Sequence, residues 1–275
     1  MGTKKPAEIA EIVACSVGVS KCNLPTGKMF VLAIFAGVYI GFGAILATTV
    51  TTGLSTYAGL GFAKFMGGAV FTVGLMLVVL CGAELFTGNN LIVTAKLDKK
   101  VTWKGLGRNW LIVYLGNFVG AMLLVLIYWG SFLWSMGNYG VGANALKIAD
   151  SKVDMGWGAA FCRGILCNIL VCLAVWMAIS AEDTSGKIAG MFFPIMAFVA
   201  MGFEHSVANM YFIPIGILLK DNAHVVAKSG LSAADLKNLD WWHFIWNNLI
   251  PVTLGNIVGG AIFVAALYWY VYRKE

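Results

Sequence analysis

"GAELFTGN" (residues 82–89) and "GFEHSVAN" (residues 202–209) carry glycine, glutamate and asparagine at the same three offsets. Each stretch interrupts a long apolar segment, and the next apolar segment repeats a second pattern: "NWLIVYLGNFVGA" (109–121) and "NLIPVTLGNIVGG" (248–260). Apolar helices resemble one another by chance because they use few residue types. Agreement at polar and glycine positions in two consecutive segments is harder to obtain that way. We infer that the chain contains an internal duplication.

The composition is that of an integral membrane protein. Hydrophobic residues make up 60% of the chain and charged residues 12%, with a mean hydropathy of +0.82, whereas about a quarter of the residues in a soluble domain are charged. Four runs lack Lys, Arg, Asp, Glu and His and are long enough for the about 20 residues that a spanning helix needs. They are residues 29–63, 109–146, 164–181 and 244–272.

Two further apolar runs are interrupted. Residues 65–83 end at Glu84, and residues 188–203 end at Glu204 and His205, after which an apolar run continues to Leu219. The sequence therefore predicts an all-α protein with six transmembrane helices, of which the second and fifth are broken. Ionisable side chains inside a membrane are costly and rarely kept without a task.

Three spans in each half make the duplication an inverted repeat, which we predict to cover residues 28–134 and 156–272. In such folds, interrupted segments at matching positions mark the transport site, because backbone leaves the helix at membrane depth only beside a cavity or inside protein. Gly82 and Gly202 are expected at the breaks. Glu84 and Glu204 are expected to be structural there, accepting hydrogen bonds from unwound backbone.

The distribution of Lys and Arg predicts the orientation. Segments on the side of the two termini hold twelve of these residues, and the opposite loops hold six, which places both termini in the cytoplasm of a cell with the chain in its inner membrane. The formal charge of +6 is then a topology signal and does not indicate nucleic-acid binding. Residues 273–275 form a short cytoplasmic tail.

Residues 1–27 are predicted to hold a cytoplasmic amphipathic helix that begins near Pro6 and lies against the membrane or a neighbouring subunit. Its apolar face would comprise Ile9, Ile12, Val13 and Val17,.

The sequence indicates neither a metal site nor an enzyme. Cys162, Cys167 and Cys172 are spaced by five residues, about 140° apart around a helix, so they share no face and are interpreted as small buried hydrophobic side chains. The chain has only three histidines, and no ligand cluster forms around His205. No cofactor is expected.

Several segments resemble the signature segments of the formate/nitrite transporter family: "CGAELFTGN", "GILCNILVCLAVW" (164–176) and "GFEHSVANMYFIPIGI". "TWKGLGRNWLIVYLGNFVGA" and "NLIPVTLGNIVGG" are most similar to its formate channel branch. The resemblance implies a homopentamer with an aquaporin-like subunit fold and one substrate path in each subunit. It also implies transport of a small monovalent anion or its neutral acid across the lipid bilayer, with formate first and nitrite or hydrosulfide as alternatives.

The resemblance implies a set of site residues. His205 would be the central histidine, Thr87 the threonine after the first break, Lys152 the lysine of the outer vestibule, and Asn168 and Asn209 the central asparagines. Apolar constrictions would be formed by Phe71, Leu75 and Phe198 on the outer side and by Leu85, Phe86 and Val171 on the inner side.

Plainer interpretations stay open for some of these residues. Thr87 could only cap a helix, Lys152 could be a solvated loop residue beside Asp150 and Asp154, and Arg163 could extend to the outer membrane interface. An aquaporin-like channel for neutral solutes shares the inverted plan, but the two Asn-Pro-Ala motifs are absent.

The mechanistic hypothesis is that the anion gains a proton near the centre and passes the constrictions as the neutral acid. Histidine titrates in the physiological range, so the proton could come from His205 or, through water, from the bulk. The gating role of the loop from Leu85 to Asn90 stays open.

Overall fold

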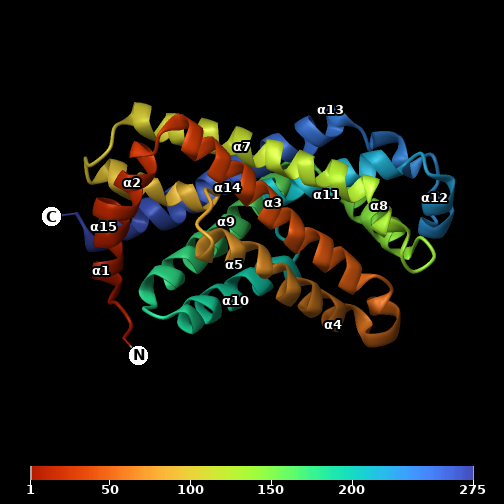
Figure 1. Ribbon diagram of the computed structural model, residues 1–275, viewed down its shortest axis with the longest axis horizontal. Helices are drawn as coiled ribbons and strands as arrows, with labels where there is room; N and C mark the ends of the chain where they lie inside the picture. Colours follow the sequence, from red (N-terminus) through yellow and green to blue (C-terminus); the bar gives the residue numbers. More distant parts are fainter. Residues whose placement is uncertain (1, 275) are drawn as a thin grey trace.

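The structure, a computed structural model, describes residues 2–274 and is almost wholly helical (Figure 1). Short 3₁₀ or π-helical segments are labelled η. The first half contains α1 (Pro6–Glu11), η1 (Ile12–Val17), α2 (Gly18–Asn23), α3 (Thr26–Thr51), α4 (Leu54–Phe71), α5 (Val73–Leu80), η2 (Gly88–Leu91), α6 (Ile92–Leu97) and α7 (Trp103–Gly130). The second half contains η3 (Leu133–Ser135), α8 (Gly140–Val153), α9 (Trp157–Ser180), α10 (Thr184–Ala200), α11 (Ser206–Leu219), α12 (Ala223–Ser229), η4 (Asp235–Asn238), α13 (Trp241–His243), η5 (Phe244–Leu249), α14 (Ile250–Ile257), η6 (Val258–Ala266) and α15 (Leu267–Tyr272).

Five helices are long and apolar enough to cross a membrane: Thr26–Thr51, Leu54–Leu80, Trp103–Gly130, Trp157–Ser180 and Trp241–Tyr272. The remaining predicted span is made of two shorter apolar helices, α10 and α11, which meet at the break around Gly202. The six-span prediction is confirmed in this form, since the fifth span is two half-helices.

A glycine with positive φ lies at each of the two helix breaks. The backbone φ is +80° at Gly82 and +75° at Gly202, in the left-handed region that costs a residue with a Cβ more than it costs glycine. Each helix therefore ends abruptly, and the chain runs without helix through residues 83–85 and 203–205 before turning again. These unwound segments bring backbone amides and carboxylates to the middle of the bundle.

The repeated "LGN-x-VG" pattern packs spans against each other at close range. A Cβ at Gly120 of α7 would overlap the carbonyl oxygen of Ile34 in α3, and a Cβ at Gly259 of η6 would overlap that of Ile165 in α9. The two helix pairs α3–α7 and α9–α14 thus occupy equivalent positions in the two halves. Close approach of helices through glycine is typical of membrane bundles.

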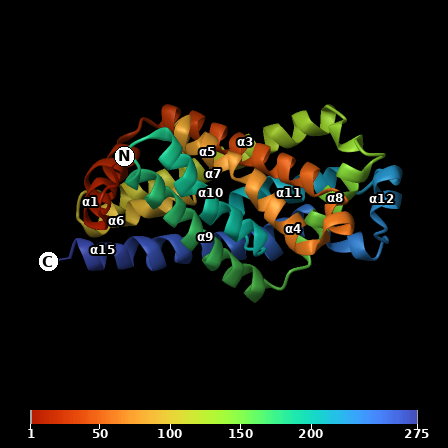
Figure 2. The same cartoon turned by 90° about the horizontal axis from the view of Figure 1, so that it is seen from below.

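Four segments predicted to lie on one side of the membrane meet at one end of the molecule. The backbone N–H of Lys4 donates to Ser180 O (3.0 Å), and Arg273 contacts Asp98. Both termini lie at this end of the long axis, and α8 and α12 lie at the other (Figures 1 and 2). Because both termini lie at the same end, the chain crosses the membrane an even number of times, in agreement with the six predicted spans.

The N-terminal helix packs on its own chain. Ile9 and Val13 are buried in a cluster with Leu91, Ile92 and Val264 from η2, α6 and η6, while Ile12 and Val17 are half-buried. Ile9 and Val13 are therefore covered by the same subunit, because the end of the broken second span and the last span supply apolar partners. Contact of the helix with the membrane or a neighbouring subunit stays a prediction.

Asp98, between α6 and α7, ties the C-terminal end of the last helix to the bundle. Its carboxylate accepts hydrogen bonds from Arg273 Nη2 (2.9 Å) and Trp269 Nε1 (3.2 Å). The hydrogen bond from the Arg273 guanidinium holds the pKa of Asp98 below its ordinary value. Because the folded state binds this proton less readily than the unfolded chain, the pair stabilises the fold above the ordinary pKa and ceases to do so as pH falls through the lowered one.

We therefore expect Asp98→Asn to lower the free energy of unfolding by about 1 kcal/mol near pH 7. The difference from the wild type should be smaller near pH 3, below the ordinary aspartate pKa of about 3.9, and should vanish only below the lowered pKa of the folded state,. Thermal unfolding in detergent at the two pH values measures it, and Arg273→Gln should behave the same way. A difference that is independent of pH would contradict the assignment.

Candidate functional site

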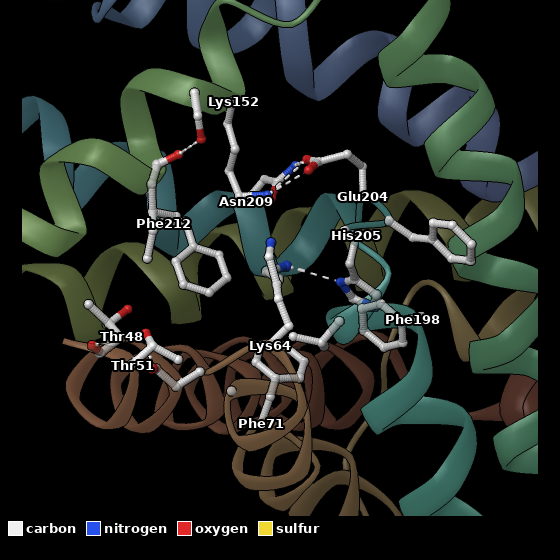
Figure 3. A pocket seen from close by; sticks show the side chains of 18 of the residues that line it. Thr48, Thr51, Lys64, Phe71, Lys152, Phe198, Glu204, His205, Asn209 and Phe212 are labelled. Atoms are coloured by element: carbon white, nitrogen blue, oxygen red, sulfur yellow. Dashed lines mark hydrogen bonds and ion pairs between the residues drawn. The ribbon is translucent and has the colours of Figure 1, made fainter. Parts of the chain in front are cut away.

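Two cavities enter the helical bundle from opposite ends of the molecule, and each is lined by the helix break of one half of the repeat. The Lys152 cavity, of about 380 Å³, is lined by residues of α3, α4, α8, α9, α10 and α11 together with the break at 202–205 (Figure 3). The Lys21 cavity, of about 320 Å³, is lined by residues of η1, α2, α5, η2, α6 and α9 and by the break at 82–85. His205 lines the first cavity and Leu85 the second.

A polar network closes the inner end of the Lys152 cavity. Lys152 Nζ lies 2.8 and 2.9 Å from the two carboxylate oxygens of Glu204. Asn209 Nδ2 donates to Glu204 Oε2 (2.7 Å) and to Asn248 Oδ1 (2.7 Å), and Asn248 Nδ2 donates to Lys152 O (3.0 Å). Lys152 is therefore ion-paired inside the cavity, which differs from the alternative of a solvated loop residue beside Asp150 and Asp154.

The same network recurs in the first half. Lys21 Nζ lies 2.6 Å from Glu84 Oε1, and Asn89 Nδ2 donates to Glu84 Oε2 (2.7 Å) and Asn109 Oδ1 (2.9 Å). Asn109 Nδ2 donates to Lys21 O (3.1 Å). The correspondence thus reaches into the N-terminal helix and α8, outside the repeat bounds of residues 28–134 and 156–272.

Asparagines, not the two glutamates, satisfy the unwound backbone. Asn256 Nδ2 donates to Gly164 O (2.8 Å) and Glu204 O (3.0 Å), and its Oδ1 accepts from Ser206 N (2.9 Å). Asn117 makes the matching three bonds to Ala33 O, Glu84 O and Phe86 N. The carboxylates were expected to take this role; their side chains instead face lysine and asparagine.

Sequence reasoning missed Lys21, Asn89, Asn109, Asn117, Asn248 and Asn256 as members of these networks. All but Lys21 stood in the repeated motifs and were used only to detect the duplication. Lys21 had a weaker signal, because it precedes Ala33 by the same spacing that separates Lys152 from Gly164.

The two polar residues at the centre of the molecule stand at positions where the two halves differ in sequence. His205 follows Glu204 as Leu85 follows Glu84, and Val207 stands where the first half has Thr87. His205 Nε2 lies 2.9 Å from Thr87 Oγ1, so the two residues unique to their halves meet in the middle. Both side chains are buried.

The tautomer of His205 follows from its role at the start of α11. Its Nδ1 accepts the backbone N–H of Ala208 (3.0 Å) and therefore carries no proton. The ring proton of the neutral imidazole is then on Nε2, which donates to Thr87 Oγ1. The Thr87 hydroxyl hydrogen remains available for another acceptor. Thr87 does not cap a helix with its side chain.

A second proton on His205 conflicts with this geometry. It would have to occupy Nδ1, which faces the N–H donor of Ala208. Charging the imidazole therefore removes the cap of α11, a contact that typically contributes about 1 kcal/mol. The arrangement favours a neutral His205.

Asn168 joins the centre from α9. Its Nδ2 donates to Thr87 O (3.2 Å) and Asn256 O (2.7 Å). Among the described residues, buried side-chain oxygens without a hydrogen-bond partner include Asn90 Oδ1, Asn168 Oδ1, Ser206 Oγ and Asn209 Oδ1. These atoms can accept a hydrogen bond from an O–H group.

The apolar residues implied by the resemblance fall into two groups. Phe71 and Phe198 line the Lys152 cavity with ring centroids 5.9 Å apart, and Phe198 stacks on His205 at 6.0 Å. Leu75, expected on the same side, instead lines the Lys21 cavity with Leu85. All four apolar side chains are buried, so aromatic and aliphatic groups separate the cavities.

Phe86 and Val171 are buried but line neither cavity. The Phe86 ring packs edge-on against Tyr114 at 4.8 Å and Trp110 at 6.0 Å. Arg163 lines the Lys152 cavity, and its carbonyl oxygen accepts the backbone N–H of Glu204 (3.2 Å).

Residues 7–270 match the model of the formate/nitrite transporter family. The chain belongs to the formate/nitrite transporter family. It is 45% identical to the formate channel FocA of Escherichia coli (strain K12) over 98% of this chain and 95% of that protein. It is 46% identical to a probable formate transporter of Methanothermobacter thermautotrophicus over 99% of this chain and 98% of that protein.

Solved structures of the family agree with the fold. A pentameric formate channel with formate bound matches with a TM-score of 0.84 at 44% identity, covering 90% of this chain and 98% of that one. An ion channel of the family matches with a TM-score of 0.74 at 29% identity. The family consists of channels and transporters, so the chain is a multi-pass membrane transport protein of this family rather than an enzyme.

Proposed function

We propose that this protein carries formate across the cell's inner membrane and that the substrate passes the centre as formic acid. The observation that carries the proposal is the buried His205–Thr87 hydrogen bond, which lies beside the apolar side chains that separate the two cavities, with His205 lining the Lys152 cavity. The names of the relatives, formate channels and transporters, support formate as the substrate.

The proposed orientation has both termini in the cytoplasm. The Lys21 cavity then opens to the cytoplasm and the Lys152 cavity to the outside, in keeping with the twelve-to-six distribution of Lys and Arg,. We also propose a homopentamer with one path in each subunit, by analogy with the pentameric structural relative.

The path imposes two demands on an anion. Phe71, Phe198 and Leu75 cannot hydrate a charge, so they exclude ions that keep their water shell,. An anion that leaves its water shell and reaches the Thr87 hydroxyl accepts its hydrogen bond. Protonation there removes the charge before the apolar side chains on the far side, Leu75 and Leu85. The new O–H group then finds acceptors among Asn168 Oδ1 and Asn209 Oδ1.

We propose that the proton comes from bulk water through the cavity. His205 Nε2–H donates to Thr87, and releasing that proton would leave an imidazolate. The alternative donor, an imidazolium, would lose the cap of α11. His205 thus acts as a fixed donor that orients the Thr87 hydroxyl toward the path.

The test is uptake into proteoliposomes of formate, nitrite, hydrosulfide and lactate, at about pH 5 and about pH 7.5, on either side of the ordinary histidine pKa. Preferred formate uptake with an internal pH change in step with flux is the expected result. Flux that carries net current with no pH change would overturn neutral-acid passage. A preference for nitrite or hydrosulfide would overturn the substrate and keep the architecture.

His205→Asn separates the two roles of the histidine. Asparagine is a good helix N-cap, so α11 should keep its start and the protein its thermal stability. The Nε2–H donor that orients Thr87 is lost, and we expect formate flux to fall and its dependence on external pH to change. Uptake with a fluorescent pH indicator measures both. Unchanged pH dependence with intact folding would refute this role.

A further inference from the structure

The two cavities have matching networks but different net charges. The ionisable residues lining the Lys21 cavity are Lys21 and Glu84, which pair at 2.6 Å, so their formal charges sum to zero. Those lining the Lys152 cavity are Lys64, Lys152, Arg163, Glu204 and the neutral His205. Three cations against one carboxylate leave a formal charge of +2 on this lining.

Lys152 does not supply this excess. Its ammonium contacts both oxygens of Glu204, and the side chains of the pair are only 13% and 4% exposed. An ion pair at this distance is a dipole, whose field falls off faster than that of a single charge. The excess charge is therefore carried by Lys64 and Arg163.

Lys64 and Arg163 are both exposed in the cavity mouth. Neither has a carboxylate within 4.0 Å among the salt bridges of residues 2–274. Figure 3 shows Lys64 among the lining side chains with no interaction drawn to its ammonium. Lys64 and Arg163 come from different halves of the repeat, Lys64 from α4 and Arg163 from α9. The first half has Leu32 at the position that corresponds to Arg163.

We infer that Lys64 and Arg163 form an anion-collecting site at the mouth of the Lys152 cavity, which makes this cavity the preferred entrance for small carboxylate anions. Unpaired charges on the walls of a cleft raise the local concentration of counter-ions and their rate of arrival. The identity of the anion rests on the proposed function, but the positive potential does not.

The electrostatic potential in each cavity can be measured without a transport assay. Ser151 lines the Lys152 cavity and Val17 the Lys21 cavity, so Ser151→Cys and Val17→Cys provide one thiol in each. Both are made in a background with Cys15→Ser, Cys81→Ser and Cys162→Ser, because these three native cysteines are exposed. The readout is the ratio of modification rates with a negatively charged and a positively charged methanethiosulfonate reagent.

We expect the ratio at Ser151→Cys to favour the anionic reagent by about tenfold over Val17→Cys. Lys64→Gln combined with Arg163→Gln should remove most of this preference and leave Val17→Cys unchanged. Salt at about 300 mM should weaken it, since the Debye length falls well below 10 Å. Lys147→Gln is the matched control, because Lys147 is an exposed cation of α8 that does not line the cavity.

The consequence for transport is measured in right-side-out and everted membrane vesicles. The double substitution should raise the KM for formate about three- to tenfold in one vesicle orientation only, with the maximal rate unchanged. Equal reagent ratios in the two cavities, or the same loss with Lys147→Gln, would overturn the inference. A charge-dependent reagent ratio without formate transport would keep the site and overturn the proposed substrate.

Discussion

Lys152→Met is expected to lower the free energy of unfolding by about 3 kcal/mol or more, because it leaves the Glu204 carboxylate buried without its cation. Glu204 is 4% exposed and sits at the break of the fifth span, where it also organises Asn209. Thermal unfolding in detergent, followed by size-exclusion chromatography, measures the loss. A melting temperature equal to that of the wild type would show that Glu204 does not depend on Lys152.

The double variant Lys152→Met/Glu204→Gln is the control. Replacing both partners removes the charge and keeps a side-chain oxygen for Asn209, so most of the lost stability should return. Lys21→Met provides a comparison within the same protein. Because Lys21 is 24% exposed, solvent compensates Glu84 in part and the expected loss is smaller.

Thr87→Val is expected to reduce formate flux at least tenfold. Valine has nearly the shape of threonine but leaves His205 Nε2–H without its acceptor, a loss of about 1–3 kcal/mol for a buried donor. It also removes the hydroxyl that meets the substrate in the proposed mechanism. Each 1.36 kcal/mol of added barrier is a factor of ten in rate.

Thr87→Ser keeps the hydroxyl and should transport within a few-fold of the wild type. Initial uptake rates in proteoliposomes, normalised to the amount of folded protein, distinguish the two variants. If Thr87→Val and Thr87→Ser have equal rates, the hydroxyl is not part of the path and Thr87 only fills space between the halves.

Much of the fold was predictable from local pattern. Charge-free runs have the length that a spanning helix needs, and a single segment in lipid satisfies its own backbone hydrogen bonds only as a helix. The repeated Gly-x-Glu stretches placed both breaks correctly at Gly82 and Gly202. The division of the fifth span into two half-helices followed from the ionisable pair at Glu204 and His205. The packing of the N-terminal helix on η2, α6 and η6 of its own chain was not predicted, because an apolar face shows that a helix packs but not against which segment.

The site was predictable only as a set of residue types. His205 and Asn168 each contact Thr87 in the structure, and Asn209 contacts Glu204, the neighbour of His205 in the chain. Their roles in transport stay predictions. Leu75 was assigned to the wrong side of His205, since position along a helix does not tell which cavity a side chain enters. Lys21 was overlooked because the repeat appeared to begin after it.

By itself, the sequence determined the membrane class, the inverted duplication and the family, because each depends on composition or on motifs within a few residues. The tertiary structure decided the pairing of Lys152 with Glu204, 52 positions apart, and of His205 with Thr87, 118 positions apart. It also decided the tautomer of His205 and which lysines remain unpaired. These properties depend on distances of a few ångströms between segments that only the packing of the two halves brings together.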